Sequence, residues 1–356
     1  MRRFLCVLLC GLMLLSTASA EKTLRLTFTG DVTLGSEELK KNQPTSFVTA
    51  AAEKGYAYFL EKVRPLFEQD DLTVINLEGP LTDKSTMENK KKTYRFRGPT
   101  EFVKILLEGS VEACNLANNH TYDFGKQGYN ATLETLAEAN LGYFGQQITY
   151  VFEKDSIKIA FFGLNSTQFN GNRNWARDEI ARMKQEDGVN AVVFVFHAGQ
   201  EYGKHHNKSQ ETYAHFAIDA GADLVIMHHP HVVQGLEIYK NRTICYSLGN
   251  FCFGGNKDVR AMEALVAGVT MTFADDGTYL GQQLDLYPVN ISGTYPGNNF
   301  QPLFVTGQQA QDVMALVQND TPYELAPFTD EAGCAPQPYL PAEEAEAPAP
   351  LEAVNE

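Results

Sequence analysis

Short apolar runs rich in β-branched and aromatic residues alternate with amphipathic segments between residues 22 and 272. Apolar runs of four to eight residues are typical of buried strands, whereas apolar residues spaced three and four apart are typical of helices. The alternation of the two predicts a layered α/β fold. The strands predicted in this region lie at 23–29, 72–77, 111–116, 157–164, 191–196, 224–227 and 243–247.

Three segments between these strands have the spacing of amphipathic helices. They lie at 101–107, 131–139 and 209–220, and a glycine follows each of them closely, as is common at helix ends. Pro99 suits the start of the first helix. Farther along, strand-like runs at 263–273 and 279–286 flank Asp276-Gly277, a dipeptide typical of the tight turn in a β-hairpin.

Both ends of the chain differ in composition from the part between them. Residues 1–20 combine two arginines, an apolar run and a closing Ala-Ser-Ala, which is the pattern of a cleaved signal peptide. We therefore expect an extracytoplasmic mature chain that begins at Glu21, with an uncleaved membrane anchor as the alternative. Residues 335–356, rich in Pro, Ala and Glu, are expected to form a disordered acidic tail. One folded domain is then expected over residues 21–334.

Charge narrows the possible partners. The 356-residue chain has 29 Lys and Arg against 44 Asp and Glu, a formal net charge of −15, which argues against nucleic acid as a partner. A basic segment at 90–97 stands out against this background. Its Arg95 and Arg97 are candidates for binding an anion, either a phosphate or the carboxylates of an acidic polymer. The alternative for this segment is a solvated loop.

Four cysteines remain after the predicted signal peptide: Cys114, Cys245, Cys252 and Cys334. In an exported protein they could pair, and Cys245 with Cys252 is one candidate disulfide. The alternative is that Cys114 and Cys245 are small buried hydrophobic residues within strands.

Polar side chains follow six of the seven predicted strands. Because ligands of open α/β sheets bind at the carboxyl ends of the strands, we expect these side chains to converge. Those with metal-binding chemistry are two carboxylates, an amide and three imidazoles: Asp31, Glu78, Asn119, His197, His229 and His231. Mixed nitrogen and oxygen ligands favour Zn, Mn or Fe, and a carboxylate such as Glu78 could bridge two divalent ions. Taken singly, each residue has an alternative role, as a hydrogen-bonded histidine or as a turn or cap residue.

The same motifs, taken in order, resemble the CapA family of capsule and poly-γ-glutamate biosynthesis proteins, within the calcineurin-like metallophosphoesterase superfamily. The resemblance runs from about residue 24 to 290 and is carried by Gly30-Asp31, Asn76-Leu77-Glu78, Asn118-Asn119-His120, His197-Ala198-Gly199-Gln200-Glu201-Tyr202, His229-Pro230-His231 and Ser247-Leu248-Gly249-Asn250-Phe251. It implies a four-layer αββα sandwich of metallophosphatase type, with the six residues named above as metal ligands. It also implies that His120 acts on the leaving group and that Asp123 orients it, a cap or turn role being the alternative for Asp123.

The chain departs from the superfamily pattern at three positions. Thr33 stands where the superfamily has the His of its Asp-x-His motif, Glu78 replaces the usual bridging Asp, and His228 replaces a Gly. These departures place the catalytic activity in question more than the fold.

Two functions follow from the resemblance. The first is a metal-dependent hydrolase, binding two divalent ions, that cleaves a phosphoester or a γ-glutamyl bond during capsule or polyglutamate synthesis or processing. The second is a non-catalytic accessory protein that binds or guides an anionic polymer beside a membrane-bound polyglutamate synthase.

Overall fold

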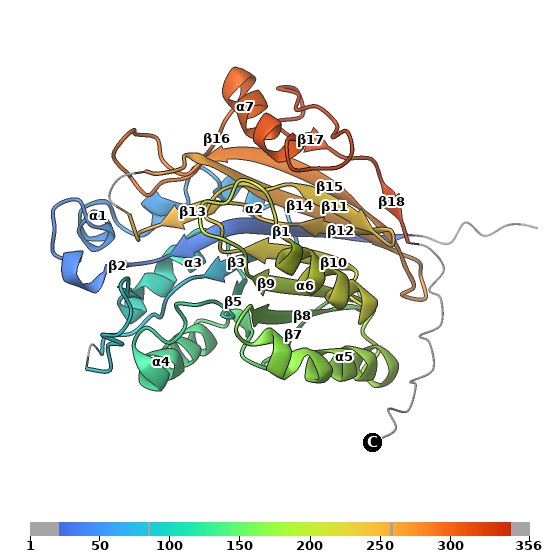
Figure 1. Ribbon diagram of the computed structural model, residues 1–356, viewed down its shortest axis with the longest axis horizontal. Helices are drawn as coiled ribbons and strands as arrows, with labels where there is room; N and C mark the ends of the chain where they lie inside the picture. Colours follow the sequence, from blue (N-terminus) through green and yellow to red (C-terminus); the bar gives the residue numbers. More distant parts are fainter. Residues whose placement is uncertain (1–20, 85, 257–258, 343–356) are drawn as a thin grey trace, which may run out of the picture.

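Two β-sheets packed face to face, with helices on their outer faces, form the protein (Figure 1). The computed structural model describes residues 21–84, 86–256 and 259–342. The predicted signal peptide lies outside the described residues.

The first sheet is built around β1 (Lys22–Thr33). β1 pairs in parallel with β3 (Leu72–Leu77) and β13 (Asn250–Phe253) and antiparallel with β14 (Glu263–Phe273). Next to β3 the sheet continues with β5 (Ala113–Asn115) and β6 (Gly142–Phe144). On the other side of β1, β14 is followed by β15 (Tyr279–Asn290). Three short strands pair with the outer edge of β15: β16 (Leu303–Phe304), β17 (Ala335–Pro336) and β18 (Leu340–Pro341).

The second sheet has the order β11 (Leu236–Tyr239), β12 (Arg242–Cys245), β10 (Leu224–His228), β9 (Ala191–His197), β8 (Ile157–Asn165) and β7 (Tyr150–Lys154). Its central strands run parallel, so their carboxyl ends share one edge. A separate two-stranded ribbon pairs β2 (Ser36–Glu37) with β4 (Phe96–Arg97).

Apolar side chains fill three layers between four layers of secondary structure. Inward-facing residues of both sheets, such as Leu26, Phe161 and Val195, form the central core, and α7 (Gly307–Gln318) adds its apolar face to it. A second cluster joins the outer face of the first sheet to helices, and a third covers the outer face of the second sheet. The helices of these outer layers are α1 (Phe47–Lys54), α2 (Arg64–Phe67), α3 (Val103–Glu108) and α4 (Gly125–Glu138) on the first sheet, and α5 (Phe169–Glu186) and α6 (Lys208–Asp219) on the second. The predicted four-layer αββα sandwich is therefore confirmed.

The predicted strands and the hairpin are present, with shifted ends. β1 continues through Asp31 to Thr33, because its last residues pair with β3 and β13, so Asp31 lies within the strand rather than after it. α4 begins at Gly125, earlier than the predicted helix at 131–139.

The structure corrects the predicted C-terminal end of the folded domain. Disorder from residue 335 is wrong for the segment up to residue 342, because β17 and β18 pair with β15 and add backbone hydrogen bonds to its edge. The rest of the predicted tail, 343–356, lies outside the described residues.

The four cysteines of the described chain are free and buried. The candidate disulfide between Cys245 and Cys252 is not formed, since Cys245 belongs to β12 in the second sheet and Cys252 to β13 in the first. Over the described residues, no helix has the length and apolar character needed to cross a membrane.

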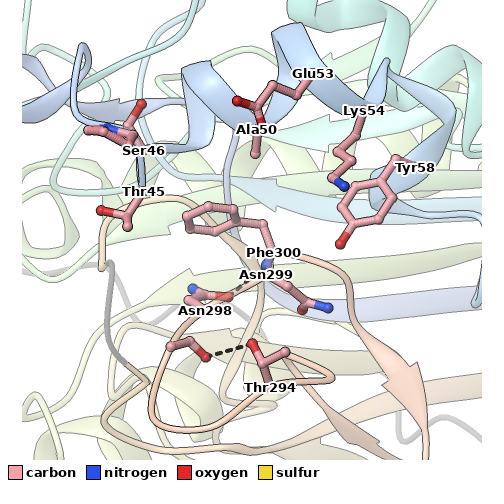
Figure 2. A pocket seen from close by; sticks show the side chains of 12 residues that line it. Thr45, Ser46, Ala50, Glu53, Lys54, Tyr58, Thr294, Asn298, Asn299 and Phe300 are labelled. Atoms are coloured by element: carbon pink, nitrogen blue, oxygen red, sulfur yellow. Dashed lines mark hydrogen bonds between the residues drawn. The ribbon is translucent and has the colours of Figure 1, made fainter.

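A pocket of about 250 Å³ lies between α1 and the loop at 294–300 (Figure 2). Lys54 and Tyr58 border it, and Phe300 and Asn299 face them across it. It shares no residue with the predicted metal ligands.

Candidate metal centre

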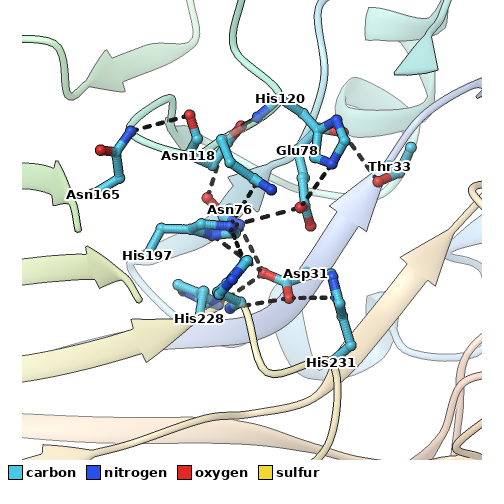
Figure 3. A network of polar contacts seen from close by, with 12 residues as sticks. Asp31, Thr33, Asn76, Glu78, Asn118, His120, Asn165, His197, His228 and His231 are labelled. Carbon is cyan, nitrogen blue, oxygen red and sulfur yellow. Dashed lines mark hydrogen bonds and ion pairs between the residues drawn. The ribbon is translucent and has the colours of Figure 1, made fainter. Parts of the chain in front are cut away.

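The predicted ligands converge where the carboxyl ends of strands from both sheets meet (Figure 3). Strand register produces this convergence: Asp31 on β1 pairs with Asn76 on β3, and His197 on β9 pairs with His228 on β10. Glu78 directly follows β3, and the loop after β10 supplies His229 and His231.

Asp31 is the most heavily bonded carboxylate of the cluster. Its Oδ1 accepts a hydrogen bond from Asn76 Nδ2 at 2.7 Å, and its Oδ2 lies 3.1 Å from His231 Nδ1 and 3.3 Å from the backbone nitrogen of His229. Burial favours the neutral form, but His231 and two further imidazoles outweigh it and hold the pKa of Asp31 below its ordinary value. Asp31 is therefore a carboxylate anion at neutral pH.

Glu78 differs sharply from Asp31. Its side chain is 0% exposed, and neither of its carboxylate oxygens has a hydrogen-bond partner among the described residues. The nearest imidazole nitrogens, Nε2 of His197 and of His120, lie 3.6 and 3.8 Å from its Oε1. Burial, reinforced by the charge of Asp31, raises the pKa of Glu78 well above its ordinary value. A buried carboxylate without partners is costly, and a bound cation would remove that cost.

The imidazoles around these carboxylates have different protonation tendencies. Burial lowers the pKa of both His197 and His229, and neighbouring imidazoles lower it further, so these rings are neutral, which is the form that binds metal. His197 Nε2 lies 2.9 Å from Asn119 Oδ1 and 3.0 Å from His229 Nδ1. At His231, Glu78 and Asp31 outweigh burial and raise the pKa to about 9. A cation would take the place of that proton between the same groups.

Two groups of side chains have the spacing needed to hold an ion. Asp31, Glu78 and His231 form a buried group, and Glu201, His229 and His231 form a more exposed one, with the ligand atoms of each group within 4.8 Å of one another. The chemistry of these donors and the unpartnered Glu78 carboxylate fit divalent transition metals. The sequence analysis did not name Glu201 as a candidate ligand, although Glu201 lies inside the quoted motif that begins at His197.

His120 and Asp123 form a pair at the edge of this cluster. His120 Nδ1 lies 2.6 Å from Asp123 Oδ2, which also accepts a hydrogen bond from the Phe96 backbone at 2.8 Å. The ring of Phe96 packs on His120 with centroids 4.5 Å apart. With Nδ1 turned to Asp123, His120 directs Nε2 toward Glu78. Asp123 therefore holds the Nδ1 side of the His120 ring.

Lys92 completes this pair and was missed as a site residue. Its Nζ forms an ion pair with the buried Asp123 carboxylate and donates to the Asn119 carbonyl at 2.6 Å. Lys92 belongs to the basic segment at 90–97, but the residues predicted from that segment to bind an anion were Arg95 and Arg97.

Those two arginines are held by acidic partners instead. Arg95 Nε lies 2.7 Å from Glu88, and Arg97 Nε lies 2.9 Å from Glu38. Both guanidinium groups also donate to backbone carbonyls. Both guanidinium groups are therefore engaged by protein groups, and anion binding by Arg95 and Arg97 stays a prediction.

Thr33 stands at the position where the superfamily pattern has a histidine. Its hydroxyl donates to the backbone carbonyl of Glu78 at 3.0 Å. Beneath the cluster, Asn118 Nδ2 donates to the Leu77 carbonyl at 2.8 Å and fixes the turn that carries Asn119.

The chain is similar in sequence to known bacterial proteins. The family model described as bacterial capsule synthesis protein PGA_cap matches residues 25–255. The chain is 31% identical over 266 residues to the capsule biosynthesis protein CapA of Bacillus anthracis, and 29% identical over 262 residues to the PGA biosynthesis protein CapA of Bacillus subtilis. These matches cover 68% and 66% of this chain and 63% and 64% of the relatives, so the chain spans a little under two thirds of their length.

More distant similarities were also found. A Mycobacterium tuberculosis protein described as a probable polyglutamine synthesis accessory protein is 26% identical over 62% of this chain and 66% of its own length. Among solved structures, a hypothetical protein from Thermus thermophilus has a TM-score of 0.43 at 13% identity, covering 74% of this chain and 99% of that one. A 5'-nucleotidase from Candida albicans has a TM-score of 0.40 at 12% identity, covering 83% of this chain and 57% of that one. On the family match and the CapA relatives, the chain belongs to the family of bacterial capsule synthesis proteins described as PGA_cap.

Proposed function

We propose that this protein is a metal-dependent hydrolase that cleaves a phosphoester or a γ-glutamyl bond during capsule or poly-γ-glutamate synthesis or processing. The observation that carries the proposal is the Glu78 carboxylate, buried and without hydrogen-bond partners among the described residues. Asp31 and three imidazoles surround it, which is a donor set suited to divalent metals.

Asp31, Glu78, Asn119, His197, His229 and His231 are the residues that would hold two divalent ions, of Mn, Fe or Zn. When bound, such ions activate water as a nucleophile and polarise a phosphoryl or acyl oxygen. His120 has the geometry of a general acid: Asp123 holds Nδ1, and Nε2 faces the cluster. Burial lowers the pKa of His120, so its imidazolium form is a stronger acid than a free imidazolium but is the minor form at neutral pH.

The names of the relatives suggest the biological setting. Two are described as biosynthesis proteins for capsule or PGA, and one as an accessory protein of polyglutamine synthesis. We infer for this chain an anionic polymer or a phosphorylated small molecule as substrate, and a membrane-bound polyglutamate synthase as partner. The signal-peptide pattern at residues 1–20 supports an extracytoplasmic location.

The test is hydrolysis by the purified protein loaded with Mn²⁺ or Zn²⁺, using a chromogenic phosphodiester and poly-γ-glutamate as substrates. The His120→Ala variant is expected to lose about 10²- to 10⁴-fold in rate, as is typical for removal of a general acid, and to keep its metal content. His215→Ala is the matched control, because His215 pairs with Glu237 away from the cluster. Equal rates in His120→Ala and the control would contradict the proposal.

One observation favours the second candidate, a non-catalytic accessory protein. Thr33 turns its hydroxyl to a backbone carbonyl, so the buried ligand group lacks an imidazole found in the superfamily pattern. This candidate predicts binding of poly-γ-glutamate that weakens with salt and falls when Lys90 and Lys91, both exposed, are replaced by Ser. Metal-dependent turnover of either substrate would count against it.

A further inference from the structure

Glu201 lies in the turn that follows β9, four residues after His197. One of its carboxylate oxygens, a ring nitrogen of His229 and a ring nitrogen of His231 all lie within 4.8 Å of one another. Glu201 is exposed, whereas Asp31, Glu78 and His231 are buried. Among the described residues, no hydrogen bond or ion pair engages this carboxylate.

Backbone hydrogen bonds hold the turn of Glu201 against the loop of the histidines. The Ala198 nitrogen donates to the His228 carbonyl at 3.0 Å, and the Tyr202 nitrogen donates to the Pro230 carbonyl at 2.7 Å. Gly199 has φ +131°, a conformation that favours glycine, and a Cβ there would stand only 3.0 Å from both Pro230 and Gln210. The position of Glu201 beside the two imidazoles therefore follows from the backbone of both segments.

Two imidazoles and one carboxylate are a ligand set that holds catalytic zinc and leaves a coordination position open. The buried and unpartnered Glu78 carboxylate gives a second, independent indication of a cation at this place, because Glu78 and Glu201 belong to groups that share His231. Aromatic contacts also surround this turn. The Arg260 guanidinium lies 5.5 Å from the centre of the Tyr202 ring, and the centre of that ring lies 6.1 Å from the centre of the His231 ring.

We propose that Glu201 is a metal ligand, and that it supplies the carboxylate of the outer of two cation positions. Asp31 and Glu78 serve the inner position, and Glu201 serves the outer one together with His229. The inference rests on the metal-dependent function proposed above. It adds a seventh candidate ligand to the six named above.

The experiment measures metal stoichiometry and affinity, without any substrate. The full-length protein is stripped with a chelator and titrated with Zn²⁺ and, separately, Mn²⁺ against a chromophoric competitor, and bound metal is counted by elemental analysis. We expect two equivalents in the unchanged protein. In Glu201→Gln we expect one equivalent bound with unchanged affinity and the other at least tenfold more weakly.

Two further variants make the result specific. Glu186→Gln, at an exposed glutamate of α5, is the matched control and should bind like the unchanged protein. Glu201→Asp keeps the charge and should recover part of the lost affinity. Metal-free Glu201→Gln should unfold at the same temperature as the unchanged protein, since the side chain is exposed.

Two equivalents bound by Glu201→Gln with unchanged affinities would overturn the assignment of Glu201 and leave the proposed function intact. Absence of metal from the unchanged protein would overturn the metal-dependent function and this inference together.

Discussion

The contacts of Lys92 could not be inferred from its position in the sequence. Lys92 lies 31 residues from Asp123 in sequence, yet its ammonium group pairs with that buried carboxylate and with the Asn119 carbonyl. The resemblance to the CapA family implied Asp123 as the residue that orients His120. Lys92 could not be predicted in this role, because only the tertiary fold brings the segment at 90–97 over His120.

At the scale of single residues, we predict that Lys92→Met lowers the free energy of unfolding by about 1–3 kcal/mol, because it leaves the buried Asp123 carboxylate without its cation. Lys91→Met, at an exposed neighbour, should change it by less than about 0.5 kcal/mol. Urea unfolding of the metal-free protein measures both. Equal stabilities in the two variants would show that the ion pair contributes nothing to the fold.

At the scale of elements, the strands were predictable and one long helix was not. Continuous apolar runs mark β8, β9 and β10, and the polar residues at their carboxyl ends marked the candidate site. α5 escaped prediction because only a narrow stripe of it is buried, at Phe169, Ala176, Ile180 and Met183. Glu201 was not predicted as a candidate ligand because it lies in a turn, where no periodicity indicates which side chains meet.

The ends of β3 and β5 opposite the metal centre make the stability depend on pH. Burial raises the pKa of Asp70 to about 6 and that of Glu112 to about 7. Between about pH 4.5 and 7 the folded state therefore holds protons that the unfolded chain has released, so the contribution of these groups to stability is lost as the pH rises. We expect the contribution of Asp70 and Glu112 to the free energy of unfolding to fall over this range.

Glu112→Gln should make this fall shallower, because the amide oxygen can still accept the hydrogen bond from the Thr73 nitrogen, 2.7 Å long in the unchanged protein, without a charge. Chemical unfolding at several pH values measures the slope. Glu134→Gln, on an exposed part of α4, is the control and should leave the slope unchanged. A slope in Glu112→Gln equal to that of the unchanged protein would show that Glu112 does not titrate as described.

At the scale of the whole molecule, a layered α/β fold could be predicted from the order of strands and helices. The resemblance to the CapA family implied the four-layer sandwich, but the C-terminal edge could not be predicted. β17 and β18 consist of two residues each and lack any apolar alternation, and only their pairing with the edge of β15 makes them strands. The acidic, proline-rich composition therefore indicated disorder too early in the chain.

Truncation tests this boundary. A chain ending at residue 334 loses β17, β18 and the hydrogen bonds from Gln337 and Ala342 to β15, and should be less stable by about 2 kcal/mol or more. A chain ending at residue 342 keeps these contacts and is the control. The two are compared by thermal unfolding, and equal midpoints would contradict a structural role for the segment at 335–342.

We infer above all that the buried Glu78 carboxylate binds metal. The most direct test compares Glu78→Gln with the unchanged protein, each in the absence and in the presence of Zn²⁺. Without metal, we predict that the variant is at least as stable, because it removes a buried and unpartnered carboxylate. With metal, the order should reverse: the unchanged protein should bind two equivalents and gain stability, and the variant should lose at least one equivalent and most of that gain. Equal metal content and equal stability gain in the two proteins would contradict the account.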